Sequence, residues 1–266
     1  MDVPALSDAE FGLFQKMIYD AAGINLSNAK KSLVSGRLGK RVKHYDLKSF
    51  GDYFRLVKLD THGEFQTAVN LLTTNETFFF REPKHFDFLR DRILPDWRAG
   101  PRRIWSAASS TGEEAHTLAM VLAEHCPTDS WEIVGTDIST RVLEKAKTGH
   151  YSLDRTEDIP RTFLQKYCLK GVGDQDGTFL VSQPLRSKIR FIHANLQHDL
   201  QKLGSFDVVF LRNVLIYFDM ETKQRVVAGL LRQLKPGGHI MVGHSESLNG
   251  VTSEVDIVVP SVYRKP

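Results

Sequence analysis

The sequence predicts an α/β protein in which a mainly parallel sheet domain follows a small all-α domain and is interrupted by an inserted antiparallel β-subdomain. The first 72 residues contain apolar positions at helical spacing and no strand pattern. From Arg103 onward, short apolar strands alternate with helical segments, a pattern typical of a parallel sheet covered on both faces. A turn-rich stretch over residues 150–187 breaks this alternation and is too long for an ordinary connection.

The composition is that of a globular protein, with 266 residues, 41% hydrophobic and 25% charged. Its two cysteines, Cys126 and Cys168, are far apart in the chain, which excludes a disulfide framework and a cysteine zinc site and fits a reducing compartment. The chain contains neither an apolar run of roughly 18 residues nor a secretory n-region followed by an apolar stretch. We therefore expect a cytoplasmic protein with no direct membrane insertion.

The all-α region, residues 1–72, begins with a capping box formed by Ser7 and Glu10, and Gly23 is a plausible helix stop. Three further helices are predicted, at about residues 28–45, from Ser49 onward, and at about residues 64–72.

Positive charge is concentrated in this region. The formal net charge is +3, but residues 28–58 hold nine basic and two acidic residues, a balance of +7 that leaves −4 for the rest. On a helix over residues 28–45, Lys30, Arg37 and Arg41 share one stripe. The stripe predicts an acidic partner. The alternative is a solvated helix face without a partner.

The sheet region begins after a polar, turn-like segment at residues 73–77 and an amphipathic helix that follows Pro83. The predicted strands are residues 103–107, 131–136, 188–193, 206–211 and 239–244, and the predicted helices are residues 113–124, 139–147 and 221–234. Residues 236–238, Pro-Gly-Gly, predict a turn into the last strand.

The inserted stretch predicts a β-hairpin with strands at residues 167–170 and 178–182 around Gly171, Gly173 and Gly177. A disordered surface loop is the alternative.

Two features predict a ligand at the carboxyl ends of the strands. The first turn, residues 105–114, is built from small residues but lacks the glycine fingerprint of dinucleotide sites, and its adjacent Glu113 and Glu114 disfavour a pyrophosphate. Asp137 ends the second strand, where an acidic residue typically binds ribose hydroxyls; the alternative is that it caps the helix beginning near Ser139. Together they favour an adenosine-containing ligand without a phosphate requirement, such as S-adenosylmethionine.

The order of motifs along the chain resembles one family. The motifs are Asn75-Glu76-Thr77-Phe78-Phe79-Phe80-Arg81, Thr111-Gly112-Glu113-Glu114, Asp137, Arg212-Asn213-Val214-Leu215-Ile216-Tyr217-Phe218 and Gly243-His244-Ser245-Glu246-Ser247. The chain closely resembles the CheR family of chemotaxis-receptor glutamate methyltransferases over nearly its whole length. The resemblance implies a Rossmann-like methyltransferase sheet at residues 91–266, reached through a linker at residues 73–90 that contributes to the cofactor site.

The resemblance also implies roles for single residues. S-adenosylmethionine would be held by Asn75, Thr77 and Arg81 from the linker, Glu113 at its methionine end, Asp137 at the ribose, Asn195 and Leu196 at the adenine, and by Arg212 and Asn213. Glu114 stays open as the alternative to Glu113. We expect at least two of the three phenylalanines Phe78, Phe79 and Phe80 to belong to the hydrophobic core. His244 is expected to have a structural role.

The implied reaction is methyl transfer to glutamate side-chain carboxylates of chemoreceptors, giving γ-methyl esters and S-adenosylhomocysteine. A carboxylate is already ionised near neutral pH, so no general base and no metal are needed. Arg81 and Tyr217 are the expected catalytic residues because they can orient the incoming carboxylate. Tyr217 could instead be a buried tyrosine with a satisfied hydroxyl.

Two surfaces are expected to meet the receptor. Lys30, Arg37 and Arg41 are the predicted substrate-binding residues, facing the acidic helical bundle, and the inserted subdomain is predicted to bind a receptor C-terminal pentapeptide by strand addition. A second hypothesis is that the enzyme methylates nucleic acid. The sequence contains no motif for a flipped base, so no nucleic-acid partner is expected. A binding module without catalysis is the third.

Overall fold

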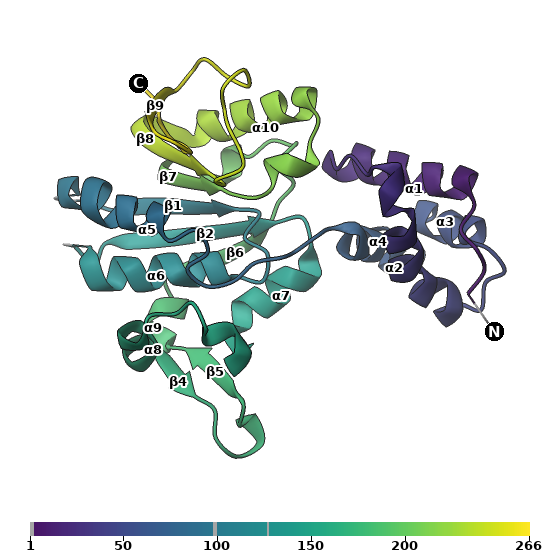
Figure 1. Cartoon of the computed structure of the whole chain (residues 1–266), viewed down its shortest axis with the longest axis horizontal. Helices are drawn as coiled ribbons and strands as arrows, with labels where there is room; N and C mark the ends of the chain where they lie inside the picture. The colour runs from purple at the N-terminus through teal and green to yellow at the C-terminus, as the bar shows by residue number, and fades with distance from the viewer. Residues whose placement is uncertain (1–2, 98–99, 127) are drawn as a thin grey trace.

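The computed structural model describes residues 3–97, 100–126 and 128–266. A helical module lies beside a central sheet domain, on the right in Figure 1, and a small subdomain projects from the lower side of that domain. The α/β fold class expected from the sequence is confirmed, including the inserted antiparallel sheet.

The helical module contains α1 (Asp8–Ala22), α2 (Lys31–His44), α3 (Phe50–Lys58) and α4 (Glu64–Leu72). Both hydrogen bonds of the Ser7–Glu10 capping box are present, and Gly23 ends α1 with φ 70°. The second helix starts later than expected, because residues 28–30 form a separate 3-10 turn. The apolar stripes of the four helices meet in one core around Phe14, Leu38 and Phe50.

The main sheet has five parallel strands: β1 (Arg102–Ala107), β2 (Trp131–Asp137), β6 (Ile189–His193), β7 (Phe206–Leu211) and β8 (Leu234–Val242). Two antiparallel strands that the sequence did not predict, β9 (Asp256–Val259) and β10 (Val262–Arg264), complete the order β6-β2-β1-β7-β8-β10-β9. The prediction of a turn at residues 236–238 was wrong, because β8 starts at Leu234 and includes these residues. The pairing of β8 with β7 shifts register at this point.

Helices cover both faces of this sheet (Figure 1). Side chains alternate along each strand, so Ile104 enters the core beneath α6 (Glu113–His125), while Trp105 enters the core beneath α10 (Met220–Gln233). The third covering helix, α7 (Thr140–Thr148), packs on β2 and β6. The helix expected after Pro83 is present as α5 (Lys84–Phe88), continued by a π turn (Leu89–Ile93) and a 3-10 turn (Leu94–Asp96).

The inserted stretch forms a three-stranded antiparallel sheet in the order β3-β5-β4, with β3 (His150–Ser152), β4 (Cys168–Lys170) and β5 (Thr178–Val181). The predicted hairpin between β4 and β5 is confirmed, and the alternative of a disordered loop was wrong. β3 is an addition, as are α8 (Arg161–Tyr167) and α9 (Gln183–Arg186). Shorter 3-10 turns occur at Thr61–Gly63, Leu153–Thr156, Gly173–Gln175, Gln201–Leu203 and Leu215–Tyr217.

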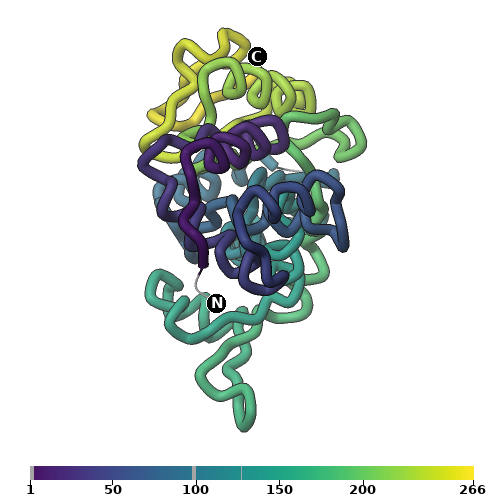
Figure 2. The backbone as a smooth tube through the Cα atoms, turned by 90° about the vertical axis from the view of Figure 1, so that its right-hand side faces the viewer, coloured from purple at the N-terminus to yellow at the C-terminus, as the bar shows by residue number. Residues whose placement is uncertain are grey.

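Hydrogen bonds join the helical module to the sheet domain. The Tyr19 hydroxyl donates to Asp219 at 2.7 Å, and the Asn195 amide donates to the carbonyl of Ala21 at 2.6 Å. Figure 2 shows the module lying in front of the sheet, with the inserted subdomain extending below. Within the described ranges, none of the helices has the length and apolar character that a bilayer crossing requires.

Candidate functional site

A cavity of about 990 Å³, including the part open to solvent, lies at the carboxyl ends of β1, β2 and β7. Such crevices are the usual ligand sites of open α/β sheets. It brings together nine of the ten residues expected at the cofactor or the transferring methyl group: Asn75, Thr77, Arg81, Asp137, Asn195, Leu196, Arg212, Asn213 and Tyr217.

The tenth residue, Glu113, does not line the cavity, whereas its neighbour Glu114 does. Successive residues of a helix point about 100° apart, so only one of the two can face the ligand. The Glu113 side chain is buried and accepts a hydrogen bond from the Thr111 hydroxyl. Burial raises the pKa of Glu113. The direction in which α6 leaves the turn therefore determines which of the two acids lines the cavity.

The linker covers one side of the cavity. Phe79 is buried in the core of the sheet domain and Phe80 packs against it, while Phe78 lines the cavity, so two of the three phenylalanines are core as expected. The Arg81 guanidinium donates to the carbonyl of Glu76 at 2.9 Å and lies 5.6 Å from the centre of the Phe78 ring. These contacts curl the linker so that Arg81 reaches back over the cavity.

The small-residue turn supplies the floor of the cavity. Ala108 and Ser110 adopt positive φ values of 62° and 50°, which bring the backbone close to the cavity. Gly112 has φ 93°, and a Cβ there would lie 2.8 Å from the Ala146 Cβ, so glycine is required. Ser109 also lines the cavity, but its hydroxyl is buried and has no hydrogen-bond partner in the described part of the chain.

Asp137 lies between the small-residue turn and the start of α7. Its carboxylate accepts from the backbone N–H groups of Ser110, at 2.9 Å, and Ser139, at 2.8 Å, and so ties the turn to the start of α7. It also lines the cavity. Burial outweighs these bonds and raises the pKa of Asp137.

Arg212 is a buried cation between two carboxylates. Its guanidinium lies 3.0 Å from Glu82 and 3.0 Å from Glu114, and it stacks over the rings of Phe86 and Phe210. Burial opposes ionisation of Glu82, but Asn213 and Arg212 outweigh it and hold the pKa of Glu82 below its usual value. Glu82 was not among the residues predicted for the site, although it directly follows Arg81, the last residue of the first motif.

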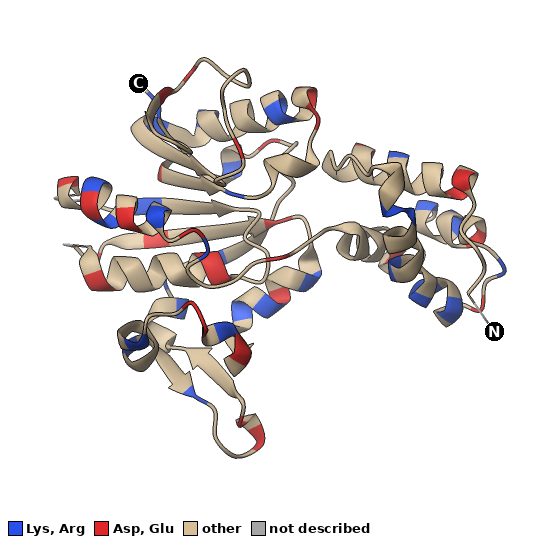
Figure 3. Ribbon diagram, in the orientation of Figure 1, with Lys and Arg blue, Asp and Glu red and all other residues tan. Residues whose placement is uncertain are grey.

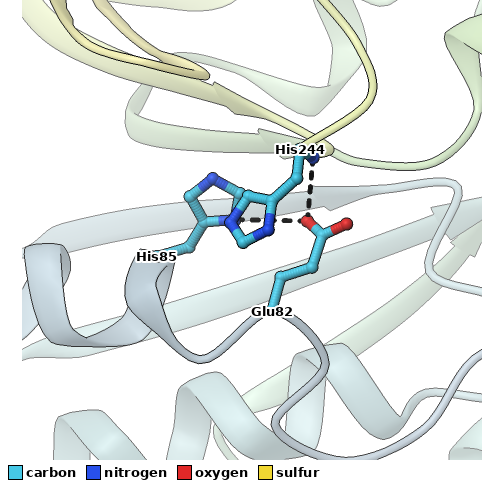
Figure 4. Close-up of side chains that lie close together, drawn as sticks. All are labelled: Glu82, His85 and His244. Carbon is cyan, nitrogen blue, oxygen red and sulfur yellow. Dashed lines mark hydrogen bonds and ion pairs between the residues drawn. The ribbon is translucent and has the colours of Figure 1, made fainter.

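Glu82, His85 and His244 form a group whose nitrogen and oxygen atoms lie within 4.8 Å of one another (Figure 4). The sequence revealed no such cluster. The Glu82 carboxylate already accepts from Arg212, from the Asn213 amide and from the backbone N–H of His244. Burial and the neighbouring Arg212 cation lower the pKa of His85 to about 3. An ion here would have to compete with Arg212 for the same carboxylate oxygen, so we explain the group as an ion-pair network.

The three residues of the predicted basic stripe differ in their surroundings: Lys30 lies in the 3-10 turn before α2, and Arg37 and Arg41 lie on α2. Lys30 is exposed, but Arg37 donates to the backbone carbonyls of Leu71, Leu72 and Thr73, and so fastens the linker to the helical module. Arg41 pairs with the buried carboxylate of Glu64, which also accepts from the Tyr53 hydroxyl. The stripe expected to face a partner is therefore free only at Lys30, because both arginines have internal acceptors.

The cavity fits S-adenosylmethionine better than a nucleotide. Two carboxylates, Asp137 and Glu114, line it and suit hydroxyl groups and a positively charged amine, whereas they would repel phosphates. Of the residues expected at the adenine, Asn195 has its amide nitrogen bound to Ala21, while Leu196 presents an apolar surface.

Comparison with known proteins identifies the family of the chain. Residues 75–263 match the family described as "CheR methyltransferase, SAM binding domain", and residues 9–73 match "CheR methyltransferase, all-alpha domain". A chemotaxis protein methyltransferase of Escherichia coli is 39% identical over 97% of this chain and 91% of its own length. Chemotaxis protein methyltransferase 2 of Pseudomonas aeruginosa is 38% identical over 96% and 92%. The protein of Borreliella burgdorferi is 35% identical over 94% and 92%. The chain belongs to the CheR family of S-adenosylmethionine-dependent chemotaxis methyltransferases.

Proposed function

We propose that this protein methylates glutamate side-chain carboxylates of methyl-accepting chemotaxis receptors in the cytoplasm and forms γ-methyl esters. One observation carries the proposal: Arg81 and Tyr217 line the same cavity as Glu114 and Asp137. The cavity thus has acidic groups for a positively charged ligand and, beside them, a cation and a hydroxyl that suit an incoming carboxylate. The relatives named as chemotaxis methyltransferases support a receptor substrate.

The proposed reaction requires no proton transfer from the attacking carboxylate. Bound S-adenosylmethionine supplies a methyl group on a positively charged sulfur. Glutamate carboxylates are ionised at neutral pH, so the protein must remove water from the carboxylate and align it rather than deprotonate it. Arg81 and Tyr217 would hold the carboxylate through charge-assisted and hydroxyl hydrogen bonds. Glu114 would face the amino group of the methionine moiety, and Asp137 the ribose.

The proposal is tested by the stability of the product. The protein is incubated with methyl-labelled S-adenosylmethionine and receptor-rich membranes, and the labelled product is treated with mild base. We expect label to appear on the receptors and to leave as volatile methanol, because carboxyl esters hydrolyse while N-methyl and base-methyl groups do not. Label that resists base would contradict carboxyl methylation, and an absence of label would favour a binding module.

The receptor bundle would approach the exposed cations of α2. Because Arg37 and Arg41 have internal partners, we assign the docking charges to exposed lysines of the same basic segment, Lys30, Lys40 and Lys43. Figure 3 shows basic residues along this helix on the side of the module away from the sheet.

Replacing Lys40 and Lys43 with glutamine is expected to lower receptor methylation several-fold at low salt and much less at 0.5 M salt, because exposed charges are screened. Stability should stay within about 0.5 kcal/mol. Initial rates at both salt concentrations check this, with Lys223→Gln on α10 as the control. Equal losses at both salt concentrations would contradict an electrostatic role.

The inserted subdomain stays a predicted binding site for a receptor C-terminal pentapeptide. β4 is an edge strand of the three-stranded sheet, and Leu169 and Val172 beside it are 59% and 79% exposed, which suits strand addition. The backbone conformation explains the glycines at these two positions, because Gly173 and Gly177 adopt positive φ values of 59° and 80°.

Titration with a receptor tail peptide is expected to give saturable binding that Val172→Asp weakens. Binding that is unchanged by this substitution would place the peptide elsewhere. Asp174→Asn at the loop tip serves as the control.

A further inference from the structure

The Gly243–Ser247 segment lies beside the cavity, and its acidic residue has three backbone partners. The carboxylate of Glu246 accepts from the N–H groups of Asn213 at 2.7 Å, Gly243 at 2.7 Å and Ile216 at 3.2 Å. Two of these donors belong to the connection between β7 and α10, which carries Asn213 and Tyr217 into the cavity. The side chain of Glu246 thus joins the segment after β8 to the segment after β7.

The connection needs such an anchor. Asn213 adopts a left-handed φ of 58°, which non-glycine residues rarely occupy without support. Leu215 and Phe218 of this connection are buried in the core, whereas the side chain of Ile216 between them is 53% exposed. Backbone N–H groups in this position have no sheet ladder to bind, and a carboxylate can accept several of them at once.

The glycine of the segment is explained by the same contact. A Cβ on Gly243 would lie 2.6 Å from the Asn213 amide nitrogen and 2.8 Å from a Glu246 oxygen. Any side chain at this position would push the two segments apart. Gly243 therefore permits the approach, and Glu246 fixes it.

We propose that Glu246 is a positioning residue for methyl transfer, whose carboxylate holds the Asn213–Tyr217 connection in the conformation that points Asn213 and Tyr217 into the cavity. The proposal rests on the function proposed above for its effect on turnover. It involves no contact between Glu246 and the reacting groups, since Glu246 is not among the residues that line the cavity.

The test substitution is Glu246→Gln, which keeps the size of the side chain but replaces one acceptor oxygen with an N–H donor that faces backbone N–H groups. We expect faster hydrogen exchange confined to peptides covering residues 212–218 and 243. We also expect kcat to fall by about 10- to 100-fold, the cost of a misplaced group, while the dissociation constant for S-adenosylmethionine changes less than about threefold. Glu254→Gln, at an exposed glutamate of the same loop region, is the control and should change neither.

A double-mutant cycle separates positioning from a general structural role. If Glu246 acts through Tyr217, then Glu246→Gln should lower kcat less than about threefold in the Tyr217→Phe background. The effects of substitutions at coupled residues are not additive. Where Tyr217→Phe itself lowers kcat, fully multiplicative losses would overturn action through Tyr217. Unchanged hydrogen exchange at residues 212–218 would overturn the proposal as a whole.

The result stays interpretable if the proposed function fails. Should the wild-type protein form no base-labile ester, receptor glutamate methylation is refuted, and the exchange comparison still decides whether Glu246 holds the connection. Should Tyr217→Phe retain wild-type kcat, the role of Tyr217 is refuted, and the kcat of Glu246→Gln decides whether the connection matters through Asn213.

Discussion

Replacement of Arg81 with alanine is expected to lower kcat/KM for receptor methylation by roughly 10²-fold or more, since removal of one preorganised charged donor typically costs that much. The guanidinium lines the cavity and is held over it by the Glu76 carbonyl and the Phe78 ring. Without it, the incoming carboxylate would lose its cationic partner. Initial rates with saturating S-adenosylmethionine measure the effect.

The fold should survive this substitution. Arg81 is only partly buried, so the melting temperature is expected to move by no more than about 2 °C. Arg90→Ala is a matched control, because Arg90 lies on the segment that follows the linker, is 40% exposed and pairs with Asp87 and Asp91. Near-normal turnover of the Arg81 variant would remove this residue from the site.

Replacement of Arg212 with methionine is expected to lower the free energy of unfolding by about 3–5 kcal/mol, the usual cost of removing one partner from a buried ion pair. The Arg212 side chain is 2% exposed and lies between Glu82 and Glu114. Methionine fills much of the same volume against Phe86 and Phe210, so the loss would come from the two uncompensated carboxylates. Urea unfolding at pH 7.5 measures it, with the exposed Arg225→Met as the control.

The pH dependence of this loss follows from Glu82. In the wild-type protein its folded pKa is lowered, so it contributes stability that is present above the unfolded pKa and is lost as pH falls. Without Arg212, burial would dominate and raise the folded pKa, and the contribution would instead be lost as pH rises. The difference between wild type and variant should therefore shrink from pH 7.5 towards pH 4.5.

A second substitution sharpens this prediction. Glu82→Gln in the Arg212→Met background should recover part of the lost stability at pH 7.5, because it removes one of the uncompensated charges. The same substitution alone should destabilise, since it leaves Arg212 with one fewer anion. A double variant no more stable than Arg212→Met would show that packing, not charge, causes the loss.

Local patterns in the sequence were sufficient for the order and type of most elements. The capping box at Ser7 and the stop at Gly23 each depend on a few neighbouring residues, as do the periodicities of α6 and α10. β9 and β10 were missed because β9 is exposed along its whole length and shows no alternation, so pairing with β8 through β10 defines it. The β3 strand, three residues long, is defined by its pairing with β5 in the same way.

Some features of the site could likewise be predicted from the sequence, and others depend on the tertiary structure. Motifs and resemblance by themselves identified nine residues that line the cavity and the cofactor that fits it. Six of them end or follow a strand, where the chain has to open at the carboxyl edge of the sheet, and the other three lie in the linker. The tertiary structure decided which of Glu113 and Glu114 faces that cavity, since the direction of α6 depends on its packing. It also showed that Arg37 and Arg41 have acceptors within the chain, which the sequence could not show because those acceptors, at residues 64 and 71–73, lie more than 20 positions away. Sequence spacing determines which side chains share a helix face, but only the packing of other segments determines what that face meets.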